Sequence, residues 1–397
     1  MRPLQIGILS CAPKTYSTRR LKDACLERGH KVRVYNTLKY SIILEKEQPE
    51  LYYGSRRAPI PDAVIPRIGA SITFFGLSVV RQFEQMGVYC ANDSIPIARS
   101  RDKLRAMQIL SRHDIGIPTT AFVRDRFEVL PAIDQVGGTP VIIKLLEGAQ
   151  GVGVILAETV KMAEAIVQTL QSARQNVLIQ KFVKESQGRD IRAFVVGDRV
   201  IAAMRRTAAH PDEFRSNVHL GGIATPVKLD AEYERTAIRA SQILGLRIAG
   251  VDMLESNEGP QVMEVNSSPG LEGIESSTGI DIASEIIADI EQRVRFPEVD
   301  LKQKMRLAAG YVIGEITVRN MPEMEEKNLR ELNLEDKGIH IISITRQKNL
   351  IPNPKGDEVI RKGDVLLCYG DTRELRKLIP DAPRKKRSKK KKARKRV

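Results

Sequence analysis

The stretch "PQVMEVNSSPGLEG", Pro260 to Gly273, decides how this chain is interpreted. It begins as an apolar strand that contains a carboxylate, Glu264, and an amide, Asn266, two residues apart, and it then breaks into Ser-Ser-Pro-Gly. Side chains two apart on a strand point to the same face of the sheet. The sequence therefore places an acid and an amide side by side just before a sharp turn.

The preceding segment, "RIAGVDMLESNEG", predicts the hairpin partner of this strand. A three-residue turn, "NEG", sets Ser256 opposite Pro260 and Asp252 opposite Glu264. Two opposed carboxylates repel each other, and a cation between them removes the repulsion. Asp252, Glu264 and Asn266 then offer oxygen ligands only, which suits Mg²⁺ or Mn²⁺ and not zinc. This register is assumed, and a one-residue slip would put the two acids on opposite faces. The alternative to a metal site is three polar residues on a solvent face of an antiparallel strand.

A glycine-rich loop between two strands is the second candidate feature. In "IIKLLEGAQGVGV", Lys144 ends an apolar strand, and Gly151 and Gly153 follow. Glycines let backbone N–H groups approach phosphate oxygens, and a lysine beside them neutralises phosphate charge. A strand follows the loop, so the motif is neither a P-loop nor a dinucleotide fingerprint. It predicts a hairpin flap over a nucleotide, and the alternative is an ordinary glycine hairpin.

Other polar positions are ambiguous on their own. The segment "VLIQKFVKE" suits an adenine site walled by Phe182 and Val183, or a plain strand end. Arg206 in "AMRR" and Arg215 in "FRSN" suit contacts to a phosphoryl group, or they are surface charges. Lys103 in "SRDKL" alone would be a surface helix lysine.

At 397 residues the chain predicts two or three domains. Alternating strand and helix patterns over residues 1–100 predict an α/β domain with a mainly parallel sheet. Strands, turns and helices over 101–297 predict a second domain, and segments rich in β-branched residues over 305–380 predict a small α+β domain. The fold class is therefore α/β and α+β.

Charge and cysteine usage bound the remaining options. Eleven of the 64 Lys and Arg residues fall in the tail 383–397, which has no acid, so we expect a disordered polybasic tail that contacts RNA or a ribosome, or has no dedicated partner. The four cysteines are scattered and predict free thiols in a reducing compartment. No apolar run is long enough for a membrane span, so we expect a cytoplasmic protein without a membrane partner.

Taken in order, these motifs resemble the ATP-grasp carboxylate–amine ligases. Within them the chain is similar to the RimK group, which adds glutamate to the C-terminus of small-subunit ribosomal protein six. "VIPRIG", "ARSRDKL", "FRSN" and "MEVNSSPGLEGIE" carry the likeness, which covers Met1 to Arg295. The resemblance implies an ATP-grasp fold preceded by a pre-ATP-grasp domain, with the nucleotide between two α+β lobes.

The resemblance also implies a role for each matching residue near the nucleotide. The expected phosphate contacts are Lys103, Lys144 and the flap glycines Gly151 and Gly153; the adenine linker is Lys181, Phe182 and Val183; the nearby acid is Asp190; the phosphate and acyl-phosphate contacts are Arg206, Arg215, Ser216 and Asn217; the metal ligands are Asp252, Glu264 and Asn266. Lys181 departs from the family pattern, which often has glutamate there, and this leaves nucleotide discrimination less certain than ATP use.

The activity implied is ATP-dependent addition of L-glutamate to a ribosomal protein C-terminus through an acyl phosphate, with two Mg²⁺ or Mn²⁺ ions. Another acceptor, such as free glutamate chains or a small amino-acid substrate, is the first alternative. A non-enzymatic protein that binds RNA or the ribosome is the second.

The segment "LNLEDKGIHIISITRQKNLIPNPKGDEVIRKGDVLLCYG" resembles a TrkA-C module. Such modules often dimerise, so we expect a homo-oligomer.

Overall fold

The computed structural model divides the chain into two compact units, Met1–Pro297 and Glu298–Val397. It describes residues 2–46, 48–146, 153–210, 213–216, 221–295, 311–319, 321–347 and 349–378. The polybasic tail 383–397 lies outside these described residues. No helix in the described ranges is both long enough and apolar enough to cross a membrane. All four cysteines are free thiols, as predicted.

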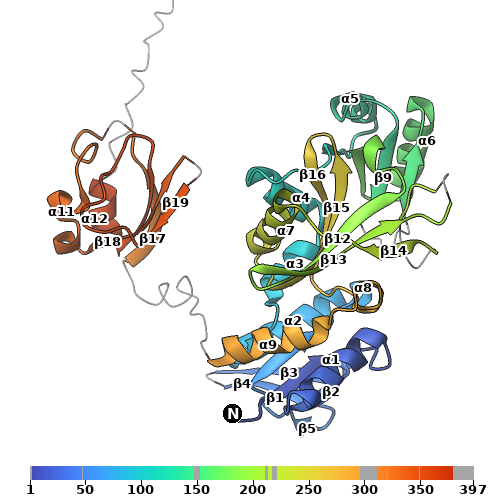
Figure 1. Ribbon diagram of the computed structural model, residues 1–397, viewed down its shortest axis with the longest axis horizontal. Helices are drawn as coiled ribbons and strands as arrows, with labels where there is room; N and C mark the ends of the chain where they lie inside the picture. Colours follow the sequence, from blue (N-terminus) through green and yellow to red (C-terminus); the bar gives the residue numbers. More distant parts are fainter. Residues whose placement is uncertain are drawn as a thin grey trace, which may run out of the picture. The chain divides into compact units, whose positions relative to one another are not determined.

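The first unit begins with a parallel sheet in the order β2-β1-β6-β7, which confirms the predicted parallel arrangement (Figure 1). Its strands are β1 (Gln5–Leu9), β2 (Lys31–Tyr35), β6 (Ala63–Pro66) and β7 (Tyr89–Cys90). Parallel strands need crossover connections, and the helices α1 (Tyr16–Glu27) and α2 (Thr73–Gln85) supply them. The sequence pattern did not indicate the small antiparallel sheet of β3 (Tyr40–Glu45), β4 (Gln48–Tyr53) and β5 (Arg56–Arg57).

A five-stranded antiparallel sheet forms the larger of the two lobes that follow the N-terminal sheet. Its strands, in spatial order, are β14 (Ile223–Pro226), β13 (Arg199–Thr207), β12 (Arg189–Val196), β15 (Ile248–Ser256) and β16 (Gly259–Asn266). Two helices, α4 (Lys103–Arg112) and α7 (Ala231–Leu244), pack against this sheet in one buried apolar cluster. Asp230 caps α7 by accepting two backbone N–H bonds, and Gly245 ends it with φ +85°.

A second, smaller antiparallel sheet forms the other lobe. Its strands, in spatial order, are β10 (Val154–Ala157), β9 (Val141–Leu145), β11 (Val177–Lys181) and β8 (Thr120–Phe122). The helices α5 (Val129–Gln135) and α6 (Val160–Ser172) share its core (Figure 1). The first unit therefore holds two antiparallel sheets whose strands carry most of the predicted site residues.

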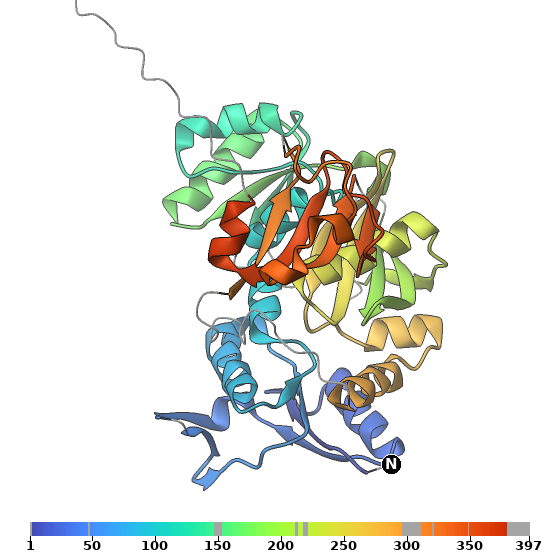
Figure 2. The ribbon, with the colours of Figure 1, turned by 90° about the vertical axis from the view of Figure 1, so that its left-hand side faces the viewer.

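Two more helices join the lobes to the N-terminal sheet. α3 (Ser94–Arg101) leads into α4, and α8 (Glu272–Thr278) follows the loop after β16. The last helix of the unit, α9 (Ile282–Arg295), lies beside α1 (Figures 1 and 2). Ile286 and Ile290 of α9 share one buried cluster with Ile8 and Leu21 from the N-terminal segment and with Phe194 of β12. The N-terminal and ATP-grasp segments thus have a continuous core.

The second unit contains a four-stranded antiparallel sheet and two short helices. The strands, in spatial order, are β17 (Tyr311–Thr317), β20 (Val365–Asp371), β18 (Ile339–Arg346) and β19 (Asn349–Pro352), and the helices are α11 (Leu329–Leu332) and α12 (Thr372–Lys377). The "KGD" turn contains Gly363 with φ +91° and ends at the buried Asp364. Arg346 Nε and Nη2 donate to Asp364 at 3.0 Å each, so this turn anchors the sheet.

Candidate active site

The hairpin of β15 and β16 places Asp252 directly opposite Glu264, as predicted. The route to this pairing differs from the prediction. The turn holds two residues and not three, so Ser256 pairs with Gly259, and the predicted pairing of Ser256 with Pro260 is wrong. A β-bulge next to Asp252 then shifts the register by one residue and brings the two acids together.

Asp252 is buried, and two arginines bond its carboxylate. Arg192, its direct neighbour on β12, donates Nε to Oδ1 at 2.7 Å and Nη2 to Oδ2 at 2.6 Å. Arg206 of β13 approaches Oδ2 with Nη2 at 3.1 Å, and Asn266 Nδ2 lies 3.4 Å from the same oxygen. Burial would raise the pKa of Asp252, but the two guanidinium groups outweigh it and hold the pKa below its usual range. The carboxylate is therefore charged.

Arg206 also bonds a second buried acid, Asp190 of β12. Arg206 Nε donates to Asp190 Oδ1 at 2.6 Å, and the Ser216 hydroxyl donates to Oδ2. Burial raises the pKa of Asp190 in spite of these donors. One buried guanidinium thus bridges two buried carboxylates, Asp190 and Asp252, from adjacent strands, and Arg192 supplies the second positive charge.

Two lysines bring positive charge to Glu264. Burial lowers the pKa of Lys144 on β9 to about 8, with Glu264 opposing the decrease and Lys103 adding to it. Burial also lowers the pKa of Lys103, and Glu264 again opposes it. Lys103 Nζ donates to the Leu145 carbonyl at 3.2 Å, which ties α4 to the smaller lobe. The lysines and the acid therefore belong to one electrostatic site that both lobes supply.

The glycine flap is partly described. Gly153 has φ +79°, and a Cβ there would lie 2.6 Å from the Leu145 side chain. The Gly153 carbonyl accepts from the Leu145 N–H at 2.9 Å and closes the hairpin of β9 and β10. The site residues Gly151 and Asn217 lie outside the described residues.

Several expected site residues have partners of their own. Arg215 donates Nε and Nη2 to Glu213 at 2.9 and 2.8 Å, and its guanidinium lies over the Phe214 ring. Its predicted phosphate contact would have to use the guanidinium N–H groups that do not bond Glu213, or exchange that carboxylate for phosphate oxygens. The Lys181 side chain is exposed and 3.8 Å from Glu258, and its backbone N–H donates to the Thr119 carbonyl.

The rest of the expected linker is more enclosed. Val183 is buried and Phe182 is half-buried. This position agrees with an apolar wall, so the walling role suits these two residues better than Lys181.

Arg192 is a site residue that the sequence reasoning did not assign. It lies two residues after Asp190 in the "DIR" motif, so the two share a face of β12. Its partner Asp252 comes from β15, and only the pairing of β12 with β15 brings them together. The motif alone signals a charged strand face but not which strand lies next to it.

The side chains that could hold a metal ion offer oxygen atoms, and some of these oxygens already accept hydrogen bonds. Within the described residues Glu264 makes no hydrogen bond or ion pair, so its carboxylate is available for a cation. Asn266 offers an amide oxygen on the same strand. Asp252 receives bonds on both oxygens, but each carboxylate oxygen has two lone-pair directions, and among the described residues Oδ1 accepts only from Arg192 Nε. These residues fit Mg²⁺, with Glu264 as the least encumbered ligand.

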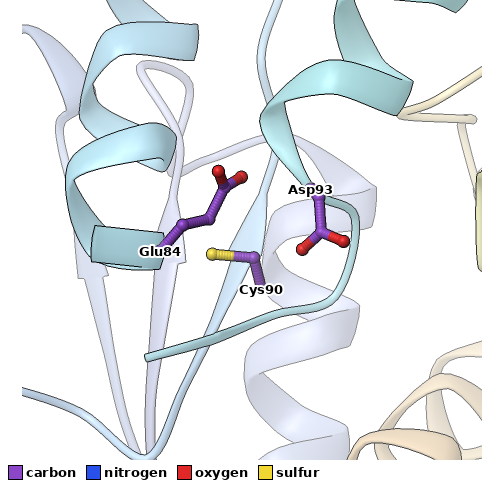
Figure 3. A group of neighbouring side chains, drawn as sticks. All are labelled: Glu84, Cys90 and Asp93. Carbon is purple, nitrogen blue, oxygen red and sulfur yellow. The ribbon is translucent and has the colours of Figure 1, made fainter. Parts of the chain in front are cut away.

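A different group of side chains, Glu84, Cys90 and Asp93, also lies close together (Figure 3). Both Glu84 oxygens accept bonds from Ser94 at the start of α3, and Asp93 lies 3.2 Å from Arg247. Burial raises the pKa of the Cys90 thiol well above its ordinary value, whereas metal ligation needs a thiolate. The contacts of Glu84 with Ser94 thus serve the start of α3.

Solved structures share the fold of the first unit. The ATP-grasp ligase PsnB complexed with minimal precursor has a TM-score of 0.59 and 21% identity, over 74% of this chain and all of that chain. A RimK domain protein ATP-grasp from Sphaerobacter thermophilus has a TM-score of 0.54 and 23% identity, over 72% of this chain and 99% of that chain. At this identity the likeness shows the ATP-grasp fold alone.

Closer likenesses appear in sequence. The RimK-like ATP-grasp domain family matches residues 100–290, the RimK PreATP-grasp domain family residues 4–97, and the TrkA-C domain family residues 313–380. A "Probable alpha-L-glutamate ligase 1" of Shewanella amazonensis is 53% identical over 73% of this chain and 96% of its own length. A "Probable alpha-L-glutamate ligase" of Rhodopirellula baltica is 57% identical over 97% of this chain and 95% of its own length. A relative this similar along almost its whole length shares its family, so this chain belongs to the RimK-like ATP-grasp family and is an ATP-dependent ligase.

Proposed function

We propose that the chain joins the α-amine of L-glutamate to the C-terminal carboxylate of a protein, with small-subunit ribosomal protein six as the first acceptor to test. The relative that shares 57% of its residues is named a probable alpha-L-glutamate ligase, which supports glutamate as the added amino acid. The observation that carries the proposal is the site itself. Glu264 lies opposite the buried Asp252 and interacts electrostatically with Lys144 and Lys103. Such a site suits an anionic nucleotide and a cation together.

ATP and Mg²⁺ are the cofactors that this site suits. Glu264, Asn266 and Asp252 would hold Mg²⁺, or Mn²⁺, with two ions as the full complement; a bound ion would offset the charge that develops on the phosphates during transfer. Lys144 brings positive charge from β9 of the smaller lobe, and Lys103 brings it from the start of α4 beside the larger sheet. A Lys144 amine with a pKa near 8 is still largely protonated at neutral pH, and phosphate oxygens beside it would raise that pKa.

The chain's own residues suit an acyl-phosphate route. A carboxylate is a poor acylating agent, and phosphorylation by ATP supplies the leaving group that the incoming amine displaces. Arg206 bonds Asp190 through Nε and Asp252 through Nη2, and so holds both acids in place. Arg215 would contact the transferred phosphoryl group after exchanging Glu213 for phosphate oxygens, together with Asn217.

The identity of the acceptor is tested directly by mass spectrometry. The full chain, MgATP, L-glutamate and candidate acceptors are incubated together, and acceptor masses should rise by whole glutamate residues located at the C-terminus. Glu264→Gln should lower the rate by about 100-fold or more. Glu258→Gln, an exposed acid in the turn of the same hairpin, is the matched control and should keep wild-type activity.

Truncation of the basic tail distinguishes the enzyme from an RNA- or ribosome-binding protein. Removal of residues 383–397 should leave ligation of a free acceptor peptide intact. If ADP is released with a different acceptor and not with the ribosomal protein, that acceptor would replace the ribosomal protein as the proposed substrate. Absence of ATP turnover with glutamate and every acceptor would refute the proposal.

A further inference from the structure

The N-terminal parallel sheet has a topological switch point between β1 and β6. The chain leaves β1 toward β2 on one side and returns to β6 on the other, so the two connections diverge at the carboxyl ends of β1 and β6. In open parallel sheets the crevice at such a point is where ligands bind. Arg67 is the first residue after β6 and donates its backbone N–H to Leu9, the last residue of β1.

The loop after the candidate metal strand β16 meets this crevice. Arg67 Nη1 donates to the Pro269 carbonyl at 2.7 Å. The Leu271 N–H donates to the Ser17 hydroxyl at 2.9 Å, and the Ser268 hydroxyl donates to the Pro66 carbonyl at 3.3 Å. The switch point therefore opens next to the loop that begins just after Glu264 and Asn266.

A second arginine, Arg101, comes from the last position of α3. One of its Nη atoms donates to the Ile68 carbonyl, next to Arg67 in the sequence. Its Nε is buried and has no hydrogen-bond partner among the residues that the structure describes. Within the part of the chain that the structure describes, neither Arg67 nor Arg101 forms an ion pair with a carboxylate. The two guanidinium groups thus contact backbone carbonyls only.

The electrostatic surroundings of the pair are unfavourable without an anion. Burial, together with the charge of Arg101, lowers the pKa of Arg67 to about 10. Burial also lowers the pKa of Arg101, which only Glu264 opposes. Glu264 is shared with Lys103 and Lys144 and is a candidate metal ligand, so it does not neutralise the arginines as well. Two desolvated guanidinium groups whose charges repel each other favour an anionic ligand.

We propose that Arg67 and Arg101 form a carboxylate-binding site for a substrate, and that the carboxylate comes from the incoming amino acid. This inference rests on the proposed function. The acceptor carboxylate would become an acyl phosphate near Glu264, whereas the carboxylates of the incoming amino acid stay anionic throughout. A bidentate hold on one of them would direct the α-amine toward the acyl carbon.

The test uses the full chain with Arg67→Ala and Arg101→Ala, the conservative Lys variants, and Arg105→Ala as an exposed control on the neighbouring helix. The KM values for ATP, acceptor and amino acid are measured with L-glutamate, L-glutamine and the α-amide of L-glutamate. The Ala variants should raise the KM for glutamate by about 10- to 100-fold. They should leave the KM for ATP unchanged and lose the wild-type discrimination against one of the two amides. The Lys variants should recover part of the loss, and Arg105→Ala should match the wild type.

These measurements distinguish a site for the carboxylate of the incoming amino acid from a site for the carboxylate of the acceptor. A raised KM for the acceptor, with discrimination between glutamate and its amides intact, would assign the site to the acceptor and overturn our choice of source. A parallel loss of kcat and of affinity for all three substrates, with discrimination intact, would show that the arginines only fix the 267–271 loop and would overturn the site. If the wild type joins another amino acid, the proposed function fails, and the same arms are run with that amino acid and its amide.

Discussion

Replacement of Arg206 by methionine tests the buried charge network most directly. The guanidinium is buried and bonds Asp190 at 2.6 Å and Asp252 at 3.1 Å. Asp252 keeps Arg192 in the variant, but Asp190 keeps only the Ser216 hydroxyl. Removal of one partner from a buried ion pair costs about 3–5 kcal/mol, and the remaining donors favour the lower value, about 3 kcal/mol.

The pH dependence of this loss has a definite sign. The pKa of Asp190 is already raised by burial, and removal of Arg206 raises it further. Folding then disfavours the charged form, so the penalty develops as pH rises above the pKa of the unfolded chain, about 4. The stability difference between Arg206→Met and wild type should therefore be largest at neutral pH. It should shrink as the pH is lowered toward about 4.

Denaturant unfolding of wild type, Arg206→Met and Arg206→Met/Asp190→Asn measures the effect without reference to activity. The single variant should lower the free energy of unfolding by about 3 kcal/mol. The double variant should recover most of the loss, because its neutral amide needs no counter-charge. A loss that is independent of pH, or that Asp190→Asn does not recover, would refute the argument that an uncompensated carboxylate causes the instability.

Three further predictions concern other parts of the first unit. Because the pKa of Lys144 is about 8, kcat/KM for ATP should fall as pH rises through that value in a pH–rate profile, and a profile that is flat there would contradict the assignment. Glu291→Gln should lower the free energy of unfolding by about 1 kcal/mol, since the carboxylate bonds Arg28 and His30. The pKa of Glu291, about 2, means that this stability is present above pH ~4 and is lost as pH falls toward 2, which acid titration of both proteins would reveal. Gly153→Ala should raise the KM for ATP, because the new Cβ meets the Leu145 side chain at a positive φ, and unchanged ATP affinity would argue against a flap role for this hairpin.

The central pairing of the site was predictable from sequence, but its cause was not. Asp252 and Glu264 were expected to oppose each other through a three-residue turn, whereas the hairpin combines a two-residue turn with a β-bulge. The shorter turn moves the pairing by one residue, so Ser256 has a different partner from the predicted one. The bulge moves the pairing back by one residue, so Asp252 still lies opposite Glu264. A bulge depends on how a strand bends against its neighbours, so local spacing cannot reveal it.

Residues whose role depends on contacts between distant segments were the ones that sequence reasoning missed. Arg192 bonds an acid sixty residues away, and Arg67 meets Pro269 from the other end of the first unit. Each is an ordinary charge in its own motif. Sequence reasoning could select the lysines and the candidate metal ligands because glycines and a strand pattern lie near them. It could not select the buried arginines, because strand order and domain packing decide which arginines are buried.

The continuous core of the first unit has a consequence for how the chain folds during synthesis. Ile8 and Leu21 need Ile286 and Ile290 of α9 to complete their burial, yet α9 is the last helix of the unit to be made. Domains usually fold as they emerge, beginning with the N-terminal one. Here the N-terminal sheet has to wait, with part of its apolar face uncovered, until the whole ATP-grasp segment has been translated. We therefore expect the isolated segment 1–100 to aggregate, and a nascent chain arrested before Ile282 to bind chaperones that recognise exposed apolar surface.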